Sequence, residues 1–164
     1  MDTLGAPLRS GESYQISVVV ADHPGALTIG KTDDLDCVYL VSSQDDSSHG
    51  LSVKFHSTDI LVKPACVESA KWLVFVDSEL DPLPIHYVGI GGPENYPSHT
   101  EIFDGTFSIQ RSELFPLAYT LNYCRMDHCS YVGINKVLIG NESDRRLMLR
   151  QAIVVVFEHD RFSL

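Results

Sequence analysis

The chain has 164 residues, enough for one well-buried core, and 44% of them are hydrophobic and 21% are charged, an ordinary globular composition. Its formal net charge of −10 at pH 7 argues against nucleic acid or an anionic membrane surface as a partner, because both require clustered Lys and Arg. No apolar run approaches the ~20 residues of a membrane span, which excludes that class as well.

Short apolar segments, rich in β-branched and aromatic residues, recur along the chain between turns of Gly, Pro, Asp, Asn and Ser. In chain order, the predicted strands are 13–20, 26–29, 37–43, 51–55, 59–62, 71–76, 85–90, 105–111, 118–124, 131–139, 145–150 and 152–157. No window shows a sustained 3.6-residue apolar period with caps at both ends. The pattern predicts one all-β domain over residues 1–164, either a sandwich or a barrel, since strand spacing alone does not distinguish the two.

The four cysteines raise the question of metal, redox or disulfide chemistry, because Cys124 and Cys129 enclose an Asp and a His. A structural zinc site usually has two close pairs of Cys or His ligands, whereas Cys37 and Cys66 each stand alone. An even number of cysteines in an acidic all-β chain suits an oxidising compartment. We therefore favour disulfides and no metal. On the ground of the cysteines we expect a secreted or vacuolar protein, and because MDTLGAPLRSGES has neither a basic nor an apolar leader region, we expect its mature form.

No catalytic constellation stands out among the 7 histidines and 22 acidic residues. His86 alternates with apolar neighbours, which favours a position on a strand face over a ligand role. The nucleophile motif Gly-x-Ser-x-Gly is absent, and VGIGGP (88–93) follows neither the dinucleotide nor the P-loop spacing. We expect no enzyme activity and no cofactor. Asn141 begins an Asn-x-Ser glycosylation sequon in a predicted hairpin turn.

Blocks of sequence along nearly the whole chain are distinctive together. They are DTLGAPLRSGESYQI (2–16), DGTFSIQR (104–111), YTLNYC (119–124) followed by Cys129 and YVGI (131–134), and DRRLMLRQAIVVVF (144–157). In this order they resemble the plant Kunitz-type, soybean trypsin inhibitor family. The resemblance implies a β-trefoil with pseudo-three-fold symmetry, the disulfides Cys37–Cys66 and Cys124–Cys129, and a monomer that inhibits a protease through a substrate-like loop between the first two cysteines.

The segment between Cys37 and Cys66 is shorter than is typical of that family, and two alignments explain it. In the first, GLSVKFHS (50–57) is the strand that leads into the inhibitory loop, Ile60 takes the specificity position, and the next strand is missing unless DILV (59–62) replaces it. The loop residues are then Ser57, Thr58, Asp59, Ile60 and Leu61. In the second, LSVKF is the later strand, the loop is deleted, and QDDSSHG (44–50) is an acidic bypass. Both alignments predict a shortened first lobe.

Neither alignment offers trypsin a suitable Arg or Lys, because Lys63 is followed directly by Pro64. Ser10 stands where the family has an Asn that supports the loop, and serine is too short to span both sides of the scissile bond. We expect inhibition of a serine protease other than trypsin. Inhibition of a cysteine or aspartic protease through the turns 81–84, 93–99 or 141–145 is a second option. The alternative is a non-inhibitory storage, defence or ligand-binding trefoil.

Overall fold

The fold is all-β, as predicted. In the computed structural model, the described residues are 1–20, 25–31, 36–43, 52–56, 59–62, 71–76, 85–103, 105–139, 142–149 and 153–159, and 13 strands among them form one sheet. The strands are β1 Ser13–Val20, β2 Gly25–Lys31, β3 Asp36–Ser43, β4 Ser52–His56, β5 Asp59–Val62, β6 Trp72–Val76, β7 Tyr87–Ile90, β8 Glu101–Phe103, β9 Thr106–Arg111, β10 Tyr119–Arg125, β11 His128–Ile139, β12 Glu142–Leu149 and β13 Val154–His159. A single 3-10 turn, Pro93–Asn95, lies between β7 and β8.

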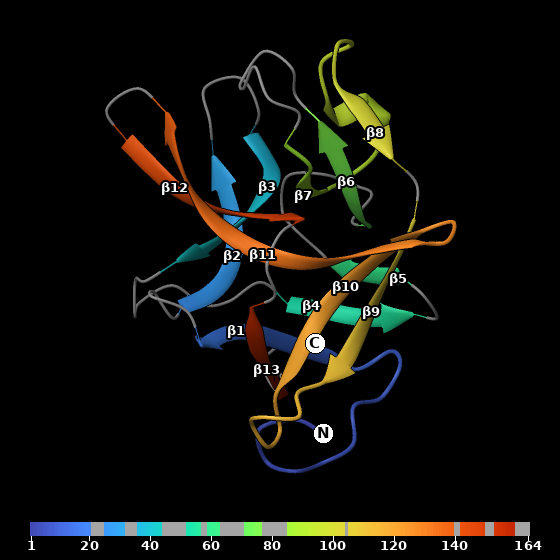
Figure 1. Ribbon diagram of the computed structural model, residues 1–164, viewed down its shortest axis with the longest axis vertical. Coiled ribbons are helices and arrows are strands. Elements are labelled where there is room, and N and C mark those ends of the chain that lie inside the picture. Colours follow the sequence, from blue (N-terminus) through green and yellow to red (C-terminus); the bar gives the residue numbers. More distant parts are fainter. Residues whose placement is uncertain are drawn as a thin grey trace.

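Six of these strands form a barrel (Figure 1). They pair in the order β5-β4-β1-β13-β10-β9, and the two end strands, β5 and β9, contact each other. Each lobe contributes two of them: β1 and β4 belong to the first lobe (β1–β4), β5 and β9 to the second (β5–β9), and β10 and β13 to the third (β10–β13). The contact between β5 and β9 brings together the two edges that an open sheet would expose, which limits edge-to-edge aggregation.

Each lobe also contains one hairpin outside the barrel, and the three hairpins meet one another. They are β2–β3, β6–β7 and β11–β12. Each pair of hairpins shares one bridge, namely Val41 with Arg146, Tyr87 with Met148, and Tyr39 with Gly89. This repeated relation among the hairpins is the pseudo-three-fold symmetry that a β-trefoil requires. Of the two predicted architectures, the structure is therefore the barrel and not the sandwich.

The first lobe has its full set of strands. Ser52–His56 lies beside β1, with Val53 opposite Tyr14, and Asp59–Val62 follows as β5, the first strand of the second lobe. DILV (59–62) therefore takes the place of the strand that the first alignment left missing. Connections between strands can change length without disturbing the hydrogen bonds of a barrel.

The core is divided between the barrel and the hairpins, and β6 separates the two parts. Trp72 and Val74 pack into the barrel core, where the Trp72 ring lies 5.6 Å from that of Phe107, edge to face. Leu73 and Phe75 point the other way, into a smaller cluster that includes Tyr87, Tyr96 and Met148. Since successive side chains of a strand point to opposite faces, an apolar run such as WLVFV predicts this burial on both faces.

Candidate functional site

The β4–β5 connection occupies the place where the resemblance puts the inhibitory loop. The antiparallel register pairs Phe55 with Ile60 and His56 with Asp59. Only Ser57 and Thr58 lie between the paired positions, and both are outside the described residues. Asp59 and Leu61 belong to strand β5. A segment that a protease accepts as a substrate must present several successive residues outside the ladder, and this register leaves only two.

Ile60 is the clearest correction to the predicted site. Its side chain is only 2% exposed and belongs to the barrel core with Val53 and Tyr14. A specificity residue must enter the pocket of another protein, so the assignment of Ile60 to that position is wrong. The prediction failed because it assigned 57–61 to a loop, whereas Asp59–Val62 pairs with β4, and pairing between strands decides which side chains enter the core.

The N-terminal segment braces β4 immediately before this connection. The Ser10 hydroxyl and the Gly11 N–H both donate hydrogen bonds to the Phe55 carbonyl, each at 3.0 Å. Nearby, the Arg9 N–H donates to the Tyr14 hydroxyl at 2.8 Å. Burial is the largest cause that raises the pKa of Tyr14 above its usual 10.0. Ser10 therefore holds the backbone of β4 at Phe55, immediately before the connection.

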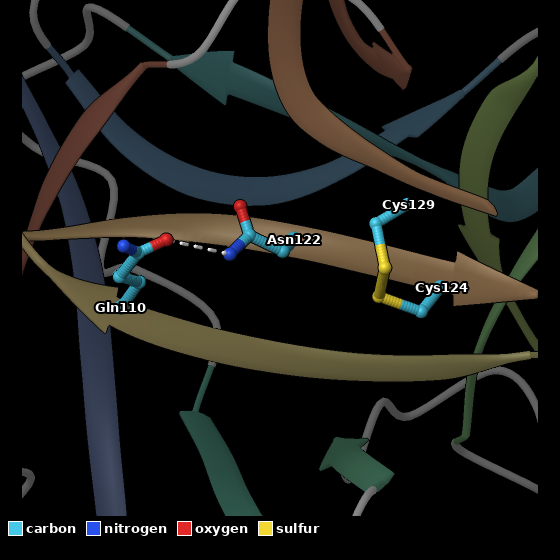
Figure 2. Close-up of a disulfide and its surroundings, with 4 residues drawn as sticks. All are labelled: Gln110, Asn122, Cys124 and Cys129. Carbon is cyan, nitrogen blue, oxygen red and sulfur yellow. Dashed lines mark hydrogen bonds between the residues drawn. A yellow bond between two sulfur atoms is a disulfide. The ribbon is translucent and has the colours of Figure 1, made fainter. Parts of the chain in front are cut away.

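The Cys124–Cys129 disulfide, which the resemblance implied, is present and joins β10 to β11 (Figure 2). Its Cα atoms lie 4.0 Å apart, and Arg125 pairs with His128 around a tight turn. Met126 in that turn has φ 55° and is 91% exposed. On the same sheet, the Asn122 amide donates to the Gln110 side-chain oxygen at 3.3 Å. The disulfide fixes a hairpin and provides no reactive thiol.

A second exposed connection, residues 112–118 between β9 and β10, was not anticipated. Leu114 is 84% exposed and Phe115 is 41% exposed. The Ser112 N–H donates to the Ala118 carbonyl at 2.8 Å, which closes the loop at its base. The sequence signal was the run LFPL, which follows a predicted strand and includes a proline. Its composition alone does not say whether such a run is buried or exposed.

The remaining predicted sites are placed only in part. Cys66, Asn141 and the turn 81–84 lie outside the described residues, and so does the predicted Cys37–Cys66 bridge. In the turn 93–99, Tyr96 is buried and its hydroxyl donates to the Ile90 carbonyl at 2.8 Å. His86 lies against the ring of Phe103, at 5.3 Å between centroids. Within the described ranges, no group of His, Cys, Asp or Glu is arranged to hold a metal, and no helix is long and apolar enough to cross a membrane.

Comparison with known proteins settles the family. The sequence model of the Kunitz legume family, described as trypsin and protease inhibitor, matches residues 1–159. The chain belongs to this family. It is a family of protease inhibitors and not of enzymes, in agreement with the prediction.

Individual relatives of this Kunitz-family chain match over most of their length. The subtilisin inhibitor CLSI-II of Canavalia lineata is 33% identical over 167 residues, which cover 91% of this chain and 84% of that protein. The Kunitz-type trypsin inhibitor-like 2 protein of Pisum sativum is 32% identical and covers 100% and 77%. A crystal structure of a Kunitz-type trypsin inhibitor from Cicer arietinum superposes with a TM-score of 0.78 at 33% identity, covering 98% and 97% of the two chains. The trefoil is thus the fold that related inhibitors share.

Proposed function

We propose that this Kunitz-family protein inhibits a serine protease other than trypsin. The observation that carries the proposal is the match to a family of protease inhibitors over residues 1–159. The β4–β5 connection leaves only Ser57 and Thr58 between paired residues. Trypsin binds Arg or Lys in its specificity pocket, and this connection contains neither. The 33% identical relative named as a subtilisin inhibitor supports a target that accepts an uncharged side chain.

Rigidity supports inhibition as the mode of action. An inhibitor must hold its binding loop in the bound conformation, because a loop that is ordered only on docking loses affinity to conformational entropy. Here the connections between barrel strands are anchored by ladder hydrogen bonds on both sides and by side-chain hydrogen bonds such as that of Ser10 to Phe55. The disulfide between Cys124 and Cys129 supports a protein made in an oxidising compartment, and we propose a secreted or vacuolar location on that ground.

The test is inhibition of a panel of purified proteases by the oxidised protein. The panel comprises trypsin, chymotrypsin, elastase, subtilisin, papain and pepsin. The expected result is inhibition of at least one of chymotrypsin, elastase and subtilisin, at concentrations well below those that affect trypsin. Stronger inhibition of trypsin would overturn the specificity, and inhibition confined to papain or pepsin would overturn the serine-protease class.

A second candidate function is favoured by the same connection. With Ile60 buried and only Ser57 and Thr58 outside the ladder, the region that the family uses for inhibition offers little to a protease. A trefoil of this kind can serve as a storage or defence protein without inhibiting anything. The panel separates the two functions, because a non-inhibitory protein leaves every protease fully active.

A further inference from the structure

The symmetry of the barrel gives the β4–β5 connection a structural equivalent. Strands β4 and β5 pair across the boundary between the first and second lobes, and β9 and β10 pair in the same antiparallel way across the boundary between the second and third. The third boundary joins β13 to β1, where the chain begins and ends. Residues 112–118 are therefore the other place at which the chain itself crosses from one lobe to the next.

This equivalent connection exposes the apolar side chains that the first one lacks. Leu114 is 84% exposed, and its neighbours Glu113 and Pro116 are exposed as well. Extended apolar patches on a surface mark interaction sites, and Leu114 and Phe115 are two adjacent exposed apolar residues. Leu114 is also of a size and polarity that suit the specificity pocket of chymotrypsin-like and subtilisin-like proteases.

The loop is braced from within. The Ser112 hydroxyl accepts hydrogen bonds from the N–H groups of Leu114 and Phe115, each at 3.3 Å. Pro116 fixes one backbone torsion, and Leu117 adopts φ 61°, a left-handed conformation that persists only when its surroundings hold it. A braced loop loses little entropy when a partner binds it.

The N-terminus supports the inner side of the loop. Phe115 and Leu117 line a groove of about 230 Å³ together with Met1 and Tyr119. The N-terminal ammonium group donates a hydrogen bond to the Tyr119 hydroxyl. Phe115 is thus directed partly toward this groove, and Leu114 is left as the side chain that projects furthest into solvent.

We propose that residues 112–118 form the protease-binding loop and that Leu114 fills the specificity pocket of a chymotrypsin-like or subtilisin-like serine protease. The inference rests on the proposed function and names its site. The bond after Leu114 leads to Phe115, whereas the bond after Phe115 leads to Pro116, which such proteases resist cleaving. The geometry therefore selects Leu114 over Phe115 as the specificity residue.

The decisive variant is Leu114→Arg, because it adds an activity instead of removing one. With arginine at 114, the loop is expected to inhibit trypsin at least about 100-fold more strongly than the native protein does, a change in the range of interface hot spots. Leu114→Asp is expected to weaken inhibition of chymotrypsin or subtilisin by about 100-fold or more for the same reason. The matched control is Met126→Asp, which places the same charge at a 91% exposed apolar residue of another turn and should change neither inhibition constant.

The outcomes distinguish this inference from the proposed function. If the native protein inhibits an apolar-preferring protease and Leu114→Asp and Met126→Asp both leave that inhibition unchanged, the function stands and the loop assignment is overturned. If the native protein inhibits nothing in the panel, the proposed function fails, and Leu114→Arg then decides the loop: trypsin inhibition supports it, and no inhibition overturns it. Thermal unfolding followed by circular dichroism verifies that each variant is folded.

Discussion

The two connections that carry the chain from lobe to lobe differ in what they present to solvent. In the first, β4 and β5 are paired up to His56 and Asp59, and the apolar residue Ile60 is 2% exposed. In the second, β9 and β10 are joined by residues 112–118, and Leu114 is 84% exposed. The same barrel thus accommodates a crossing whose flanking strands are paired up to the last described residue and a crossing that exposes a leucine. The frame fixes where the chain crosses between lobes, and the two connections differ in how many residues lie outside the ladder.

The largest difference between the two regions should appear in stability, when Ile60 beside the first connection and Leu114 in the second are each truncated to alanine. Ile60→Ala removes a core side chain, and we expect it to lower the free energy of unfolding by about 2–5 kcal/mol. Leu114→Ala removes a side chain that is mostly in water, so its effect should stay within about 0.5 kcal/mol. Urea unfolding of both variants measures the difference. Equal effects would mean that the two connections are not the buried and exposed counterparts described above.

The hairpin that follows the second connection offers the next test. Replacing both Cys124 and Cys129 by Ser removes the constraint on the unfolded chain, and the short loop that they close predicts a loss of about 2 kcal/mol. Because neither connection lies inside that loop, inhibition of the target protease should be unchanged at a temperature where the variant is folded. Chemical unfolding and the inhibition constant are measured on the same sample. A large loss of inhibition in the folded variant would place the binding site on the disulfide hairpin instead.

Each connection has one serine that braces it, and the two serines form a matched pair. Ser10→Ala removes the hydroxyl that donates to Phe55, and Ser112→Ala removes the acceptor for the Leu114 and Phe115 N–H groups. Both variants should lose about 1 kcal/mol of stability at most. Only Ser112→Ala should accelerate cleavage within 112–118 by chymotrypsin, by about fivefold if the full 1 kcal/mol loosens the loop. Mass spectrometry of the fragments locates the cut. If Ser10→Ala accelerated cleavage within 112–118 equally, the Ser112 hydrogen bonds would not be what protects this loop.

The sequence was sufficient for the frame and insufficient for the site. DILV was predicted as a strand at 59–62 and is one, because the apolar run Ile-Leu-Val, with two β-branched residues, ends at Lys-Pro and carries a strong local signal. The side that Ile60 faces depends on its pairing with Phe55, a relation between strands that no local pattern encodes. Strand β8, Glu101–Phe103, was missed because it is a short strand defined by its pairing with β6. The exposure of Leu114 likewise depends on where the barrel ends.

The smallest effect concerns the segment that braces the first connection, and it depends on pH. Burial raises the pKa of the Tyr14 hydroxyl above 10.0, so the folded protein keeps this proton at a pH where the unfolded chain begins to release it. The resulting stability is fully present below pH 10 and is lost as the pH rises through the folded pKa. Tyr14→Phe should remove this part of the alkaline decline in unfolding free energy, measured between pH 8 and pH 11, while Leu114→Ala leaves it intact. If Tyr14→Phe declines as steeply as the native protein, the alkaline loss belongs to other groups.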